Sequence, residues 1–123
     1  MFRSSREAKP VEMLAGITRR TLTYGDRTLL VEFTILAGSV FPEHQHPYEQ
    51  IGYLCTGKGR LWIGKEVHGL VPGASWCIPA GVPHRAEFSE NTVAIDIFSP
   101  VREDYLDPED RPWKPGAQRK PPG

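Results

Sequence analysis

Short apolar runs, broken by Gly and Pro, repeat along most of this chain. In residues 28–36, Val31, Phe33 and Ile35 alternate with polar neighbours, which is the period of a half-buried β-strand. Similar runs predict further strands at residues 17–23, 43–46, 50–56, 60–63, 67–71, 75–79, 84–88 and 92–98. Short strands with turn signals every eight to ten residues or so predict an all-β fold, an antiparallel sandwich or barrel.

One short helix is expected near the C-terminus. Ser99 can cap it, and Pro100 suits the first helical position. Glu103 and Asp104 suit the positive end of the helix dipole. Pro108 would end the helix, because proline keeps the preceding residue out of the helical region.

With 123 residues, the chain fits one domain. We expect an N-terminal arm at residues 1–14, a barrel at 15–106 and a tail at 107–123. The tail holds five of the twelve prolines and cannot pack a core of its own. Trp113 is its candidate anchor, against the barrel or against a second copy of the chain.

The composition indicates which partners the protein can bind and in which compartment it is expected. Fifteen Lys and Arg balance fifteen Asp and Glu, so nothing draws the protein to nucleic acid or to an acidic membrane. The N-terminus lacks an apolar signal segment, and no run approaches the roughly 20 apolar residues of a membrane span. We therefore expect a cytoplasmic protein. Cys55 and Cys77 sit in apolar strand contexts and are expected as buried small hydrophobes rather than as a disulfide.

Three of the four histidines suggest a metal site. His44 and His46 are two positions apart, so on a strand both point to the same face. His84, from another strand, and an amide oxygen from Gln50 could complete the ligands of one cation. His68 has no such partners and is interpreted as an ordinary surface or core residue.

These histidines lie within two blocks that resemble the paired motifs of the cupin superfamily. The matching positions are Gly38, His44, His46 and Gly57 in the first block, and Gly73, Pro79, Gly81 and His84 in the second. The resemblance covers residues of about 15 to 105. It implies a double-stranded β-helix (jelly-roll barrel) with a metal near one mouth, and a homodimer in which the N-terminal run and the Trp113 tail cover sheet edges.

Two positions depart from the cupin pattern. Gln50 stands where the family usually has a ligand Glu, and Phe88 stands where the second motif usually ends in Asn. An amide leaves the full charge of a dication in the cavity, and it cannot act as a base. Glu49 should point away from the site. Imidazole ligands favour a divalent transition metal, zinc, nickel, iron or manganese, over magnesium and calcium.

Asp96 lies in an apolar strand, where a buried carboxylate needs a partner or a function. It forms an ion pair with Arg102 or Arg20, or it is a general acid or base facing the cavity. The aromatic residues that could line this cavity are Tyr48, Tyr53, Trp62, Trp76 and Phe88. Strand parity leaves open which of them face inward.

A narrower resemblance concerns residues 44–50 and 96–105. These runs look like those of small bacterial cupins that include the proteins linearising unsaturated monouronates in pectin and alginate breakdown. The likeness implies that Asp96 moves a proton and that Arg102 binds the substrate carboxylate, both as catalytic residues. The leading hypothesis is thus a lyase or isomerase of carbohydrate metabolism acting on a small acid. A metal-dependent dioxygenase and a non-catalytic small-molecule-binding cupin remain the alternatives.

Overall fold

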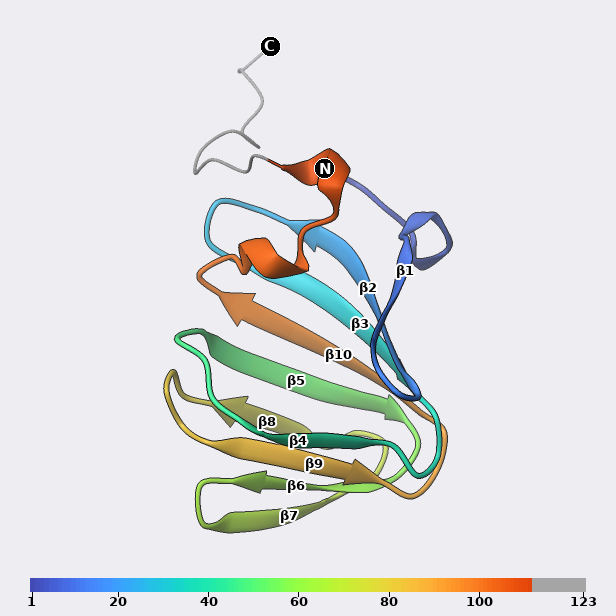
Figure 1. Ribbon diagram of the computed structural model, residues 1–123, viewed down its shortest axis with the longest axis vertical. Helices are drawn as coiled ribbons and strands as arrows, with labels where there is room; N and C mark the ends of the chain where they lie inside the picture. Colours follow the sequence, from blue (N-terminus) through green and yellow to red (C-terminus); the bar gives the residue numbers. More distant parts are fainter. Residues whose placement is uncertain (112–123) are drawn as a thin grey trace.

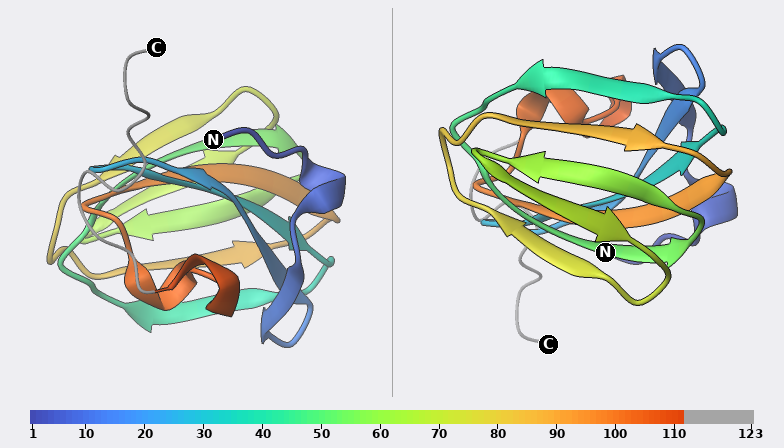
Figure 2. Two further views of the ribbon diagram at one scale, coloured as in Figure 1. Left: turned by 90° about the horizontal axis from the view of Figure 1, so that it is seen from above. Right: turned by 90° about the horizontal axis from the view of Figure 1, so that it is seen from below.

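The computed structural model describes residues 1–111, which form two antiparallel β-sheets facing each other (Figures 1 and 2). The six-stranded sheet has the order β1 (Pro10–Leu14), β2 (Ile17–Tyr24), β3 (Leu29–Ile35), β10 (Thr92–Ser99), β5 (Glu49–Thr56) and β8 (Ser75–Ile78). The four-stranded sheet has the order β4 (Val40–His44), β9 (His84–Phe88), β6 (Gly59–Ile63) and β7 (Glu66–Leu70). The all-β antiparallel prediction is therefore confirmed.

Every strand expected from the sequence is present, but β4 spans Val40–His44 rather than residues 43–46, so the expectation that His46 shares this strand with His44 was wrong. The expected strands did not include β1. None of its five side chains is fully buried, and it is held as an edge strand by pairing with β2.

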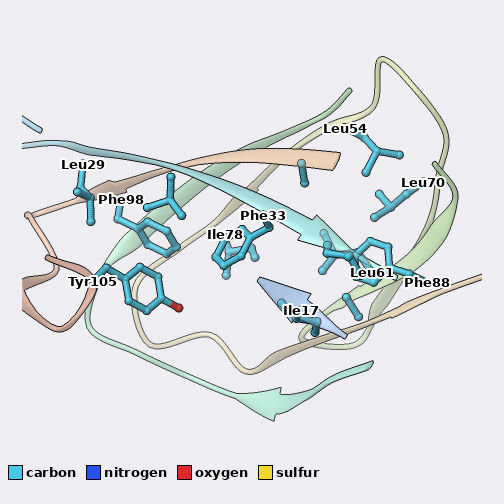
Figure 3. Packing of buried hydrophobic residues seen from close by; sticks show 14 of the residues in the cluster. Ile17, Leu29, Phe33, Leu54, Leu61, Leu70, Ile78, Phe88, Phe98 and Tyr105 are labelled. Atoms are coloured by element: carbon cyan, nitrogen blue, oxygen red, sulfur yellow. The ribbon is translucent and has the colours of Figure 1, made fainter. Parts of the chain in front are cut away.

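The core fills the space between the sheets with alternate residues of each strand (Figure 3). In β3, Leu29, Val31, Phe33 and Ile35 all point inward and are buried. This alternation matches the two-residue period that predicted the strand.

The expected C-terminal helix is absent, so this prediction was wrong. Two short 3-10 turns, η2 (Glu103–Tyr105) and η3 (Pro108–Asp110), take its place, and Ser99 is the last residue of β10 rather than a cap. A tertiary contact replaces the helix. Arg19 Nη1 and Thr21 Oγ1 both donate to the carbonyl oxygen of Tyr105, which holds this residue against β2. The chain then leaves Tyr105 in extended conformation.

The first residues of the predicted tail lie against the barrel. Asp107 is buried beside Arg19, with 3.8 Å between the charged groups. Trp113 and its expected anchoring lie outside the described residues, and the division into arm, barrel and tail stays a prediction. None of the helices in residues 1–111 has the length and apolar character needed to cross a membrane.

The cysteines differ from expectation. Cys77 is exposed and Cys55 is half-buried, and both are free thiols. The reason is strand parity: Leu54 and Trp76 turn toward the interior, so the next residue on each strand faces outward.

Candidate metal centre

His44, His46 and His84 come together where β4 ends and β9 begins. His44 is the last residue of β4 and lies directly opposite His84, the first residue of β9. His46 follows in the loop that leads to β5. One nitrogen from each ring lies within 4.8 Å of the others, so the structure brings together the three histidines predicted from their spacing.

Backbone carbonyl groups orient all three rings. The Nδ1 atom of His44 donates to the Pro42 carbonyl oxygen at 2.9 Å, and that of His84 donates to the Val82 oxygen at 2.8 Å. His46 Nδ1 donates to the carbonyl oxygen of Tyr48 at 3.1 Å. Because Nδ1 carries the proton in each neutral ring, the lone pair of Nε2 is free to bind a metal.

Two features of the Nε2 atoms fit a cation. His84 Nε2 is buried and has no hydrogen-bond partner among the described residues. His46 Nε2 lies 3.0 Å from Gln50 Oε1, so two acceptor atoms face each other. Two lone pairs at this distance repel unless a cation or a proton lies between them, and ligand atoms about 2.1 Å from one metal stand about this far apart. The donor set therefore suits a transition metal.

The neighbouring residues support this arrangement. Gln50 is half-buried and faces the cluster, whereas Glu49 is exposed. His44 is exposed while His46 and His84 are buried, so the cluster is open to solvent on the His44 side. His68 is exposed on β7 and contacts Glu66 at 3.1 Å, away from the cluster.

Burial keeps the two inner histidines neutral. Desolvation lowers the pKa of His84 to about 4. The pKa of His46 is lowered as well, first by burial and then by the positive charge of Arg102. A neutral imidazole need not lose a proton before it binds a metal, so these positions are ready for a cation near neutral pH.

The histidine cluster opens into a cavity that runs into the barrel, and Asp96 lines this cavity. Asp96 is buried, and no arginine in residues 1–111 lies within ion-pair distance of it, so the predicted pairing with Arg102 or Arg20 is wrong. Its Oδ1 atom accepts no hydrogen bond within that part of the chain. Burial raises the pKa of Asp96 to about 7, although hydrogen bonding to Gln50 and Trp76 opposes the rise.

Arg102 lines the same cavity, and two residues to which the sequence analysis gave no role at the site hold it in place. Asp104 accepts two hydrogen bonds from the guanidinium, at 3.2 and 2.8 Å. The guanidinium also stacks 3.8 Å from the ring centre of Tyr105, which packs on Phe98 inside the barrel (Figure 3). These partners are two and three residues after Arg102, but only the turn η2 brings them back against it.

The aromatic residues expected in the cavity wall differ in where the structure places them. Trp76 and Phe88 line the cavity, whereas Tyr53 is exposed on the outer face of its sheet. Trp62 stacks with Arg85, at 3.6 Å, and Tyr48 lies 5.0 Å from the Arg102 guanidinium.

Comparisons with known proteins agree with this geometry. The pectin degradation protein KdgF of Dickeya dadantii (strain 3937) is 30% identical over 97 residues, which cover 77% of this chain and 88% of that protein. The structure of KdgF from Halomonas sp. superposes with a TM-score of 0.81 at 30% identity, covering 86% of this chain and 98% of that one. An RmlC-like cupin from Shewanella frigidimarina also gives a TM-score of 0.81, at 25% identity, covering 85% and 95% of the two chains.

The family described as "Cupin domain" matches residues 31–98, which run from β3 to the end of β10 and include all three clustered histidines. Together with the two-sheet barrel and its relatives, this match shows that the chain belongs to the cupin family.

Proposed function

We propose that this protein is a metal-dependent enzyme that opens the ring of an unsaturated uronate or a related keto-sugar acid, or tautomerises it. The supporting observation is that His44 and His84 of the histidine cluster line one cavity together with Asp96, whose Oδ1 atom is unpaired within residues 1–111, and with Arg102. The likeness to a pectin degradation protein over most of both chains points to the same class of substrate.

In this proposal His44, His46, His84 and Gln50 hold a divalent transition metal. Zinc, nickel, iron and manganese all suit such donors. The metal would supply Lewis acidity, polarising a hydroxyl or keto oxygen of the substrate.

Asp96 is the proposed proton shuttle. Opening a cyclic hemiacetal breaks the O–H bond of the anomeric hydroxyl and the bond from the anomeric carbon to the ring oxygen, and it forms a carbonyl group. The carboxylate of Asp96 takes the hydroxyl proton and then returns it to the ring oxygen, so one residue serves both steps. Its free Oδ1 atom, inside the cavity, is available for this exchange.

Arg102 is the proposed binding residue for the substrate carboxylate. A guanidinium presents paired donors that match a carboxylate. Asp104 already occupies the Nε and Nη2 edge, so the substrate would meet the remaining donors, which are those of Nη1 and the second N–H of Nη2. The stacking on Tyr105 fixes the plane in which these donors lie.

The test is an assay of the metal-replete protein on a 4,5-unsaturated monouronate, following the ultraviolet absorbance of its conjugated double bond. Ring opening leaves an enol at the former ring oxygen, and conversion of this enol to the ketone removes the conjugated double bond. We therefore expect saturable loss of absorbance that a chelator abolishes and that Asp96→Asn slows by about 10²-fold or more. Oxygen uptake in the same assay would favour the dioxygenase, and binding without turnover would favour the binding cupin. Either result would overturn the proposal.

A further inference from the structure

Tyr105 carries a hydroxyl group into the cavity that Asp96 and Arg102 line. The residue belongs to the cavity wall and is only 7% exposed. Figure 3 shows its ring next to Phe98, with the hydroxyl oxygen directed toward the interior of the barrel. Neither metal binding nor the proposed proton transfer uses this polar group.

Contacts of the ring and the backbone account for the position of Tyr105. The ring packs edge-to-face on Phe98 and Phe33, with ring centres 5.4 and 6.3 Å apart. The guanidinium groups of Arg102 and Arg19 lie 3.8 and 5.2 Å from the ring centre. The backbone carbonyl oxygen accepts hydrogen bonds from Arg19 and from the β2 strand. A phenylalanine could make all of these contacts, so none of them requires the hydroxyl group.

The hydroxyl group of Tyr105 forms no hydrogen bond with any residue in the range 1–111. Burial raises the pKa of Tyr105, so the hydroxyl keeps its proton near neutral pH and can donate as well as accept. A buried hydroxyl without a partner lowers the stability of a protein. The group therefore suits a hydrogen bond with a molecule that enters the cavity.

The hydroxyl group and the guanidinium of Arg102 are held side by side. Stacking at 3.8 Å keeps the guanidinium over the ring that carries the hydroxyl, and Asp104 fixes the guanidinium along another edge. A ligand whose carboxylate meets Arg102 thus places its neighbouring atoms beside the hydroxyl group of Tyr105. In a uronate these atoms are ring carbons with hydroxyl groups, whereas an apolar acid offers no partner there.

We propose that the hydroxyl group of Tyr105 binds a ring hydroxyl group of the substrate and so selects polyhydroxylated acids over acids without hydroxyl groups. The ligand class rests on the proposed function, in which Arg102 binds the carboxylate. A site built to hydrogen-bond a substrate hydroxyl rejects an analogue that lacks it, because the polar group of the site is then left unpaired. The packing of the ring keeps this group in place before the substrate arrives.

The test compares the binding of two acids to the wild type and to Tyr105→Phe. D-galacturonate is a saturated uronate, whereas tetrahydropyran-2-carboxylate has the same ring and carboxylate without hydroxyl groups. Tyr53→Phe is the matched control, because Tyr53 is 50% exposed on the outer face of its sheet. Calorimetric titration of the metal-replete proteins to about 20 mM ligand, well above the usual range of KM values, gives each Kd.

We expect the Kd for galacturonate to be about fivefold higher or more in Tyr105→Phe than in the wild type. The Kd for tetrahydropyran-2-carboxylate should be the same in all three proteins, and Tyr53→Phe should match the wild type for both acids. Denaturant unfolding without either acid is the second measurement. Tyr105→Phe should be at least as stable as the wild type, because it removes an unpaired hydroxyl from a buried position.

Four results would overturn the proposal. The first is a wild type that does not bind galacturonate, and the second is an equal Kd for galacturonate in the wild type and Tyr105→Phe. The third is an equal rise in Kd for both acids, which indicates a displaced Arg102 rather than a lost hydrogen bond. The fourth is a lower stability of Tyr105→Phe without ligand, which means that the hydroxyl has a structural partner in the chain.

Turnover separates this proposal from the proposed function. A selective loss of galacturonate affinity in a protein without ring-opening activity supports the role of Tyr105 and overturns the enzyme. Ring opening with the same kcat and KM in Tyr105→Phe and the wild type does the reverse.

Discussion

Asp96 on β10 lies directly opposite Gly52 on β5, and the missing side chain of Gly52 makes room for the carboxyl group. A methyl group at Gly52 would overlap both Asp96 Oδ1 and the indole of Trp76. The glycine therefore positions the residue on which the proposed proton transfer depends.

Gly52→Ala should displace Asp96 and Trp76 within a buried part of the barrel. Because the clash involves packed groups, we expect a loss of about 1–3 kcal/mol in the free energy of unfolding and a large loss of turnover. Denaturant unfolding and the ring-opening assay measure the two effects. Gly69→Ala is the control, since a methyl group there meets nothing within 4 Å. Equal activity in Gly52→Ala and the wild type would contradict the proposed role of Asp96 in proton transfer.

Asp96→Asn should stabilise the metal-free protein at high pH. The folded pKa of about 7 lies above the ordinary value of 3.8, so the folded state binds more protons between these values. The buried carboxylate then costs stability above pH 7, on the order of 4 kcal/mol, and this cost disappears as the pH falls toward 4.

Melting temperatures of the metal-free wild type and Asp96→Asn, taken from pH 4 to pH 9, check this prediction. The advantage of the variant should be greatest near pH 9 and vanish near pH 4. An advantage that is constant across the range would mean that Asp96 does not titrate in this window.

Arg102→Lys should weaken substrate binding while leaving the metal in place. Lysine keeps the charge but loses the paired donors and the stacking on Tyr105. We expect KM for a uronate to rise about tenfold or more with metal content unchanged. Steady-state kinetics on the uronate and on its methyl ester would separate carboxylate recognition from general damage. A similar rise for both compounds would contradict the assigned role.

Arg19→Met should destabilise the barrel by about 3 kcal/mol or more, because it leaves the buried Asp107 without its cation and removes a donor from the Tyr105 carbonyl oxygen. Replacing both charged residues, as in Arg19→Met with Asp107→Leu, should recover part of the loss. Chemical denaturation of the four proteins in this cycle gives the coupling. Strictly additive losses would show that the two side chains act independently.

The sequence predicted the sheets well because strand periodicity and Gly/Pro turns are local signals. The histidine cluster was also predicted, although His46 lies in the loop after β4, so a shared strand face is not what brings it to His44.

Other features depended on contacts that local patterns do not contain. The helix expected after Ser99 fails because Arg19, far away in the sequence, binds the Tyr105 carbonyl oxygen. The contacts of Asp104 and Tyr105 with the Arg102 guanidinium form only because the turn η2 brings both residues back against it. The exposure of Cys77 follows from which face of β8 meets the core, which a run of apolar residues on both faces conceals.

The most direct test of the account is the metal content of protein purified without a metal-affinity resin. Elemental analysis of the wild type, His84→Ala and the control His68→Ala should show about one transition-metal ion per chain in the wild type and the control, and almost none in His84→Ala. Metal retained in full by His84→Ala, or absent from the wild type even after incubation with zinc, nickel, iron or manganese, would contradict the metal centre.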